Sequence, residues 1–212
     1  MAGIGTDHID ADGALTAAAQ ADAFLVEDEV LRDARGRAAE YGLTVPPPSF
    51  GGALRFLAAL LDARSVVEVG TGTGVTGVWL LRGMRPDGVL TSVDPDPDYQ
   101  RMARTAFTAA GVPSNRARLI AGRPIEVLPR LTDGHYDLMS VCADPLEYAD
   151  YLREAPRLLR DGGAVVFGDA TGSSPGAMRA LGKELVASED FAAVLLPVGT
   201  GLLAATKRAV RA

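Results

Sequence analysis

The run VVEVGTGTGVTG, at residues 66–77, decides how the rest of the chain is organised. The β-branched residues at 65–69 predict a short buried strand, and a helical pattern begins at Val75 after three alternating glycines. Glycine suits this turn because the chain bends sharply off the strand and a ligand can approach a backbone without a Cβ. The helix that follows directs unpaired N–H groups at the same space. The stretch therefore predicts a cofactor cradle at the carboxyl end of a first β-strand.

Two cofactors fit the glycine spacing of this cradle. Gly72, Gly74 and Gly77 satisfy the dinucleotide fingerprint, and Asp94 follows Gly74 by twenty residues. However, the acidic Glu68 inside the strand and the threonine hydroxyls of the turn suit an amino-acid zwitterion better than a pyrophosphate. The pattern resembles the first motif of S-adenosylmethionine (SAM) methyltransferases. SAM is therefore the preferred cofactor, and NAD or another nucleotide stays the alternative.

Length and composition indicate a single domain. A chain of 212 residues can bury roughly 70% of its unfolded surface. A formal charge of -6 and a pI near 5.0 argue against a nucleic-acid partner, which needs clustered lysine and arginine. Cys142 is the only cysteine, which excludes an internal disulfide and indicates a reducing compartment. No apolar run has membrane-spanning length, so we expect a cytoplasmic protein without a membrane partner.

The N-terminal part precedes the predicted cofactor unit. Residues 1–19 are small and acidic, which predicts disorder. Residues 20–41 carry apolar positions at helical spacing, and this helix would be either a lid or an oligomer surface. After a stiff connector at 45–48, Ser49 is the predicted N-cap of a helix that ends near Leu61. The residues expected to face inward on that helix are Leu54, Leu57, Leu60 and Leu61.

Strand and helix patterns alternate along the rest of the chain. The predicted strands are residues 65–69, 89–93, 118–121, 136–141, 163–168, 192–196 and 202–206. Helical patterns separate the first six strands, whereas residues 197–201 form a hairpin turn before the last. The alternation predicts a parallel, doubly wound sheet, and the hairpin predicts one antiparallel strand. The expected fold is α/β and Rossmann-like, with seven strands and helices on both faces.

Five further motifs make a family resemblance specific. They are LTSVD (90–94), GRPIEVLP (122–129), YDL (136–138), LLRDGG (158–163) and LPVGTGL (196–202). With the cradle, they resemble the cation-dependent O-methyltransferases of the catechol and caffeoyl-CoA type, most closely an actinobacterial branch with an altered metal site. The resemblance implies a class I SAM methyltransferase domain at residues 20–212, in which N-terminal helices (20–61) precede the SAM-binding core (62–212).

The resemblance also implies which residues bind SAM and its demethylated product, SAH. The methionine portion would contact the strand end and glycine turn, and the backbone at 122–124 would frame the adenine. Asp94 would accept hydrogen bonds from both ribose hydroxyls through its two carboxylate oxygens. Each position also has an ordinary explanation, such as a turn-forming glycine or a helix-terminal hydroxyl. The expected cofactor-binding residues are Val45, Glu68, Gly70, Thr71, Gly72, Thr76, Asp94, Gly122, Arg123, Pro124 and Cys142.

The catalytic positions of the family are altered here. By the resemblance, a metal-binding aspartate is replaced by Cys142, the catalytic lysine by Pro145, and an Asp-Asn pair by Asp169-Ala170. Hard divalent cations need oxygen ligands, so we expect no Mg²⁺ site, although a Cys142 thiolate would favour zinc. The other reading of Cys142 is a small buried residue. Asp144 and Asp169 remain as catalytic candidates, and no residue can be assigned as the base.

Methyl transfer needs little acid-base chemistry because the sulfonium of SAM is already activated, and the protein mainly aligns the acceptor. Three hypotheses follow. The first is a metal-free SAM-dependent methyltransferase acting on a small molecule, and the resemblance alone implies that the reaction is O-methylation. The second is a SAM-binding pseudoenzyme that acts as a sensor or partner protein, and the third is a nucleotide binder. The resemblance further implies a homodimer that pairs through residues 20–41 and the closing hairpin.

Overall fold

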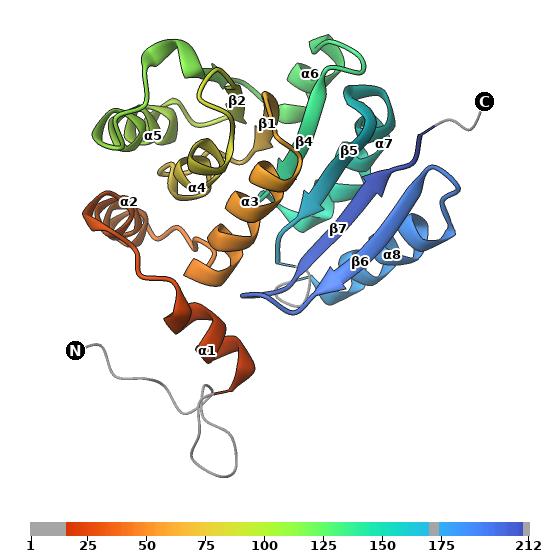
Figure 1. Cartoon of the computed structure of the whole chain (residues 1–212), viewed down its shortest axis with the longest axis horizontal. Helices are drawn as coiled ribbons and strands as arrows, with labels where there is room; N and C mark the ends of the chain where they lie inside the picture. The colour runs from red at the N-terminus through yellow and green to blue at the C-terminus, as the bar shows by residue number, and fades with distance from the viewer. Residues whose placement is uncertain (1–15, 170–173, 210–212) are drawn as a thin grey trace.

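The structure is a computed structural model that describes residues 16–169 and 174–209. Its centre is a seven-stranded sheet of order β3-β2-β1-β4-β5-β7-β6, in which β7 runs antiparallel to both of its neighbours (Figure 1). The predicted Rossmann-like α/β fold with one antiparallel strand is therefore confirmed. The strands are β1 (Ser65–Val69), β2 (Val89–Asp94), β3 (Ala117–Ala121), β4 (Tyr136–Val141), β5 (Leu159–Phe167), β6 (Phe191–Leu196) and β7 (Leu202–Lys207).

Helices cover both faces of the sheet. One layer is α2 (Glu29–Glu40), α3 (Pro48–Leu60), α4 (Val75–Gly83) and α5 (Pro97–Ala109); the other is α6 (Pro124–Val127), α7 (Tyr148–Leu158) and α8 (Pro175–Ala187). Short 3₁₀ turns are η2 (Ser114–Arg116), η3 (Leu128–Arg130) and η4 (Pro145–Glu147). Successive strand residues point to opposite faces of the sheet. In β1, Val66 therefore packs against the layer of α2 to α5, whereas Val67 and Val69 pack against the layer of α6 to α8. Within the described ranges, no helix is long and apolar enough to cross a membrane.

The predicted helix at 20–41 is two helices, α1 (Ala17–Phe24) and α2. The chain breaks between them because the Asp28 carboxylate accepts the Leu31 N–H at 3.2 Å and starts a new helix. Phe24, one of the apolar residues of the predicted helix, is 84% exposed. Of the segment predicted to be disordered, residues 1–15 lie outside the described part, and residues 17–19 belong to α1.

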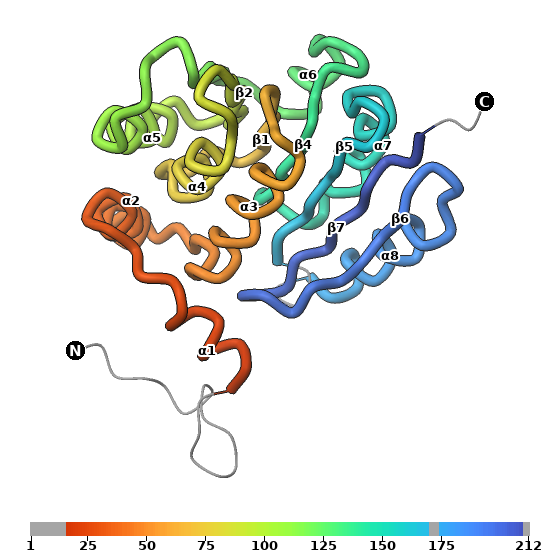
Figure 2. The backbone as a smooth tube through the Cα atoms, viewed as in Figure 1, coloured from red at the N-terminus to blue at the C-terminus, as the bar shows by residue number. Residues whose placement is uncertain are grey.

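The start of α3 differs from the prediction. Its N-cap is Pro47, and Ser49 instead donates its backbone N–H to the Asp22 carboxylate of α1 at 3.0 Å. This long-range carboxylate satisfies one unpaired N–H at the helix start, so α1 lies next to the start of α3 (Figure 2). Leu54 is buried as expected, but Leu60 is 68% exposed because it lies on the outer face of the last helical turn.

Candidate active site

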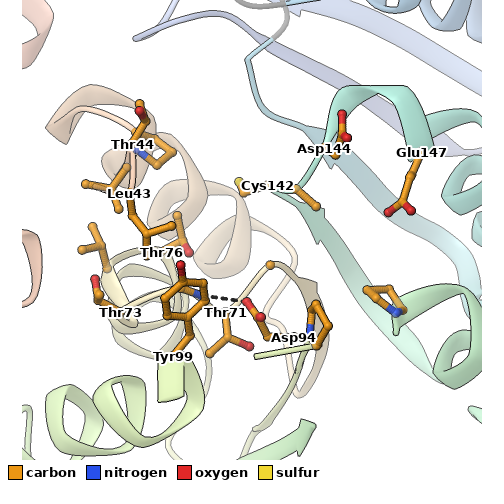
Figure 3. Close-up of a pocket in the computed structure, with 18 of the residues that line it drawn as sticks. Leu43, Thr44, Thr71, Thr73, Thr76, Asp94, Tyr99, Cys142, Asp144 and Glu147 are labelled. Carbon is orange, nitrogen blue, oxygen red and sulfur yellow. Dashed lines mark hydrogen bonds between the residues drawn. The ribbon is translucent and has the colours of Figure 1, made fainter. Parts of the chain in front are cut away.

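A cavity of about 280 Å³ lies at the carboxyl ends of β1, β2 and β4 (Figure 3). This edge of a parallel sheet is where α/β folds of this type bind ligands. The segment before α3 forms one wall, the turn after β1 forms the floor, and residues after β2 and β4 close the other sides. The lining residues are Leu43, Thr44, Val45, Pro46, Gly70, Thr71, Gly72, Thr73, Val75, Thr76, Asp94, Pro95, Tyr99, Pro124, Cys142, Ala143, Asp144, Glu147 and Tyr151.

The glycine turn (residues 70–74) has a backbone that needs glycine at its first position. Gly70 has φ +90°, and a Cβ there would lie 2.1 Å from the carbonyl oxygen of Cys142. The end of β4 therefore approaches β1 more closely than a side chain would allow. Gly72, with φ +48°, has no atom within 4 Å of its Cβ position, so its backbone faces open space. These features match the predicted cradle for a ligand.

Glu68 lies behind the glycine turn and does not line the cavity. Its carboxylate accepts hydrogen bonds from Thr76 Oγ1 at 2.7 Å and Ser92 Oγ at 2.6 Å, and the Thr71 hydroxyl lies 2.7 Å from that of Ser92. The contact of Glu68 with the methionine portion stays a prediction; in this structure its side chain lies on the α4 face and braces the turn. Burial raises the pKa of Glu68 to about 7, against the opposing effect of the two hydroxyl donors.

A Glu68→Gln variant should lose a pH dependence of stability. The pKa of Glu68 is raised from 4.5 to about 7 on folding, so its favourable contribution is present below pH 4.5 and lost as pH rises to 7. Wild-type protein should therefore lose roughly 1–3 kcal/mol more unfolding free energy between pH 5 and 8 than the variant. Urea unfolding at both pH values measures this difference. Glu126→Gln, which changes an exposed carboxylate, should show the same pH dependence of unfolding free energy as wild type. If Glu68→Gln also lost as much unfolding free energy between pH 5 and 8 as wild type, the prediction would be wrong.

Asp94 reaches the cavity from the end of β2 and is held in place by the backbone. One carboxylate oxygen accepts the Gly72 N–H at 3.1 Å (Figure 3), and the other accepts the Asp96 N–H at 2.9 Å. Each oxygen of a carboxylate can accept two hydrogen bonds, so each retains one acceptor position. Asp94 is 6% exposed and faces the cavity. This geometry is compatible with the predicted acceptance of two ribose hydroxyls.

The structure brings most of the predicted cofactor residues together. Val45, Gly70, Thr71, Gly72, Thr76, Asp94, Pro124 and Cys142 line the cavity. Gly122 and Arg123 do not: Arg123 is exposed and pairs with Glu126 at 3.5 Å. Sequence reasoning missed Tyr99, which points into the cavity beside Asp94 (Figure 3). Its place in the first turn of the helix after β2 could have indicated this, because that turn lies at the ligand-binding edge.

A buried ion pair fixes the wall formed by Val45 and Pro46. Arg35 of α2 donates Nε and Nη2 to the two oxygens of Glu27, at 2.9 and 2.6 Å. Its Nη1 donates to the Pro46 carbonyl at 2.9 Å. The Glu27 side chain is only 8% exposed, so the two-pronged contact holds Arg35 in one orientation. The helix before the core thereby positions a segment that lines the cavity.

Arg35→Ala should weaken SAM binding about tenfold and lower stability by about 2 kcal/mol, because Glu27 would stay buried without its partner. Arg35→Lys should recover only part of the affinity, since an ammonium cannot reproduce the planar fork. Calorimetric titration and thermal unfolding measure the two effects. Arg82→Ala in α4 is the control because it removes a more exposed ion pair, in which Asp28, the neighbour of Glu27, lies 2.5 Å from Arg82. Equal SAM affinity in wild type and Arg35→Ala would contradict the prediction.

A second cavity of about 320 Å³ adjoins the first. The two share Thr44, Val45, Pro46, Cys142 and Ala143, so one wall serves both. The remaining lining residues of the second cavity are Pro47, Pro145, Tyr148, Gly168, Asp169 and Thr200. Of the two catalytic candidates, Asp144 lines the first cavity and Asp169 the second. The two cavities are therefore neighbours at the carboxyl end of β4.

The residues at the expected metal position do not suit a hard cation. Cys142 and Asp169 both line the second cavity, but burial and the nearby Glu68 raise the pKa of the Cys142 thiol well above its usual range. A protonated thiol and one carboxylate do not make the oxygen-rich ligand set of Mg²⁺. In the described part of the chain, no three His, Cys, Asp or Glu side chains are grouped to hold a metal ion. The absence of a metal requirement stays a prediction.

The fold and the cavity define a class I SAM-dependent methyltransferase. The model of the O-methyltransferase family matches residues 21–208, and the chain belongs to this family. A protein of Mycobacterium sp. (strain KMS), whose name assigns it to the O-methyltransferases, is 44% identical over 200 residues, which is 89% of this chain and 91% of the relative.

Solved structures that are 25% identical or more show the same fold. A Corynebacterium glutamicum protein superposes with a TM-score of 0.83 at 28% identity, covering 91% of this chain and 95% of its own. The O-methyltransferase TomG of Streptomyces achromogenes, which is involved in tomaymycin synthesis and was solved with SAM, gives a TM-score of 0.79 at 27% identity. That match covers 90% of this chain and 96% of TomG. The predicted family is thereby confirmed.

Proposed function

We propose that this protein transfers the methyl group of SAM to a hydroxyl group of a small molecule and does so without a divalent cation. The observation that carries the proposal is the pair of adjoining cavities with a common wall at Thr44, Val45, Pro46, Cys142 and Ala143. When bound, SAM supplies an activated methyl group on its sulfonium. The chain's own residues then have to bind SAM, orient the acceptor and exclude water.

The first cavity has the polar groups that SAM needs. The backbone of the glycine turn is open to a ligand at Gly72, and Asp94 keeps acceptor positions for ribose hydroxyls. The charged residues that line this cavity are Asp94, Asp144 and Glu147, all acidic. SAM carries a net positive charge at neutral pH because its ammonium and sulfonium outnumber its carboxylate. An acidic lining therefore favours SAM over a dinucleotide pyrophosphate.

The second cavity would hold the acceptor hydroxyl next to the reacting methyl. Asp169 lies on its wall, where a carboxylate can accept a hydrogen bond from that hydroxyl. The prolines of the wall present apolar surface that displaces water. Cys142 lines both cavities. Its raised pKa keeps the thiol neutral, so no thiolate would lie where the methyl group passes from SAM to the acceptor. Alignment is the main contribution of these residues.

The test is calorimetric titration with SAM and SAH, with and without Mg²⁺, followed by transfer of labelled methyl from SAM to a panel of phenols in EDTA. We expect binding that ignores Mg²⁺ and product that forms in EDTA. A strict requirement for Mg²⁺ would overturn the metal-free mechanism. SAH binding with no product across the panel would favour the alternative, a SAM-binding pseudoenzyme acting as a sensor or partner protein. No binding of SAM or SAH would overturn both and lead to the nucleotide alternative.

We also propose that the protein is a cytoplasmic homodimer. Both segments expected to pair subunits expose large apolar side chains, namely Phe24 (84%) and Val26 (87%) near α1 and Val194 (50%) and Leu195 (53%) on the edge strand β6. Apolar groups gathered in this way are typical of interaction surfaces. Light scattering should give twice the monomer mass for wild type and a lower mass for Leu195→Asp. A monomeric wild type would overturn the proposal.

A further inference from the structure

The charges around the two cavities have a single sign. Among residues 16–169 and 174–209, the charged residues that line either cavity are Asp94, Asp144, Glu147 and Asp169, and neither lining includes Lys, Arg or His. An anionic acceptor would therefore meet carboxylates and find no cationic lining group to pair with.

The uncharged part of the second cavity suits a flat apolar body. Pro46, Pro47 and Pro145 contribute ring surfaces to its walls. The Tyr148 hydroxyl donates to the Ala143 carbonyl at 3.1 Å and accepts the Ala143 N–H at 3.3 Å, so this polar group is already engaged with the backbone. At Gly168, a Cβ would lie 3.1 Å from Phe50 Cζ and 3.2 Å from Cys142 Sγ, so the floor is closely packed.

The size of the cavity limits the acceptor further. A volume of about 320 Å³ is at the lower end of the roughly 300–1,000 Å³ usual for small-molecule sites. One aromatic ring with a short substituent fits such a space, whereas a second ring or a long chain would extend into solvent or into the cofactor cavity. The wall that the two cavities share keeps the ring's hydroxyl near the methyl donor.

We propose that the second cavity takes single-ring phenols that are neutral or cationic and discriminates against those with a carboxylate or phosphate, including coenzyme A thioesters. The inference rests on the proposed function. In the reaction, the methyl carbon leaves the sulfur of SAM and bonds to the phenol oxygen, the C–S electron pair stays on sulfur to give neutral SAH, and the hydroxyl proton passes to water. A unit charge on the acceptor about 5 Å from Asp169 would change affinity by up to roughly 300-fold at an effective dielectric constant near 20, and solvent screening lowers this value.

Three phenols of equal shape test the inference. They are 4-hydroxybenzylamine, 4-hydroxybenzyl alcohol and 4-hydroxybenzoate, which are cationic, neutral and anionic at pH 7.5. Each is titrated calorimetrically into protein saturated with SAH, and methyl transfer from SAM is measured in parallel. We expect the benzoate to bind at least tenfold more weakly than the other two. Asp169→Asn should reduce the affinity difference between the benzoate and the other two phenols severalfold. Asp150→Asn, which removes a carboxylate outside both linings, should leave this affinity difference unchanged.

The outcomes separate this inference from the proposed function. The inference would be overturned if 4-hydroxybenzoate bound as tightly as 4-hydroxybenzylamine, or if none of the three phenols bound. If Asp169→Asn left the affinity difference between the benzoate and the other two phenols unchanged, the role given to the Asp169 carboxylate would be wrong, and so would the inference. The expected order of affinities without any methylated product would support the inference on acceptor charge, and it would instead contradict the proposal that the protein is an active transferase.

Discussion

Replacing Gly70 with alanine is expected to weaken SAM binding by more than 100-fold and to lower stability by roughly 2–4 kcal/mol. The new Cβ would lie 2.1 Å from the Cys142 carbonyl oxygen, which is a backbone atom that cannot rotate away. Either β1 and β4 separate at this edge or the turn changes conformation, and both distort the floor of the cavity. The φ of +90° adds strain for any residue with a side chain. Calorimetry with SAM and urea unfolding measure the two effects.

Gly111→Ala is the matched control for this prediction. Gly111 has a positive φ of +72° after α5, but no atom lies within 4 Å of its Cβ position. It therefore carries the backbone strain without the collision and should lower stability by about 1 kcal/mol with no change in SAM affinity. Far-UV circular dichroism establishes that Gly70→Ala is folded under the conditions of titration. A folded Gly70→Ala protein that binds SAM within threefold of wild type would refute the role of the glycine turn.

Asp94→Ala is expected to weaken SAM binding about 100-fold. Two charge-assisted hydrogen bonds to ribose hydroxyls contribute roughly 1.5–3 kcal/mol each, of which part is recovered by water entering the space. The effect on stability should be smaller, about 1 kcal/mol. The N–H groups of Gly72 and Asp96 lose an acceptor, but the buried Glu68 also loses a neighbouring negative charge. Titration with SAM and with SAH, which share the ribose, should show a loss for both ligands, and the loss should be larger for SAM because of its positive charge.

Asp96→Ala is the control for Asp94→Ala. Asp96 lies two residues away but caps α5, where its carboxylate accepts the Asp98 N–H at 2.8 Å, and it does not line the cavity. The loss of this cap should lower stability by about 1 kcal/mol and leave SAM affinity unchanged. A loss of SAM binding in Asp96→Ala as large as in Asp94→Ala would show that the effect arises from the helix terminus and not from the ribose contact.

The parts of the candidate site whose placement at the cavity could be predicted from the sequence are set by local chemistry. The glycine turn is predictable because positive φ values and close backbone approach require glycine at fixed positions after a strand. Asp94 is predictable because the end of β2 must lie beside the end of β1 in a parallel sheet. In contrast, the side on which Glu68 lies depends on strand alternation combined with the packing of α4.

The wall of the site could not be predicted because its contacts join segments far apart in the chain. The break between α1 and α2 is coupled to the buried Glu27–Arg35 pair, whose partner carbonyl at Pro46 lies beyond α2. A helical apolar pattern by itself does not reveal a carboxylate that will be buried eight residues before its arginine. For the same reason Ser49 was a poor guide to the start of α3, since the acceptor for its N–H comes from Asp22.

The sequence by itself determined the order of strands and helices, the one antiparallel strand and the position of the cofactor turn. Periodicity, turn residues and glycine requirements are local properties that act within a few residues of each other. Only the tertiary structure decided that Glu68 braces the turn from behind, that Arg35 fixes the wall, and that two acidic-lined cavities adjoin at Cys142. These features depend on packing between segments that approach only after the sheet and both helical layers have assembled.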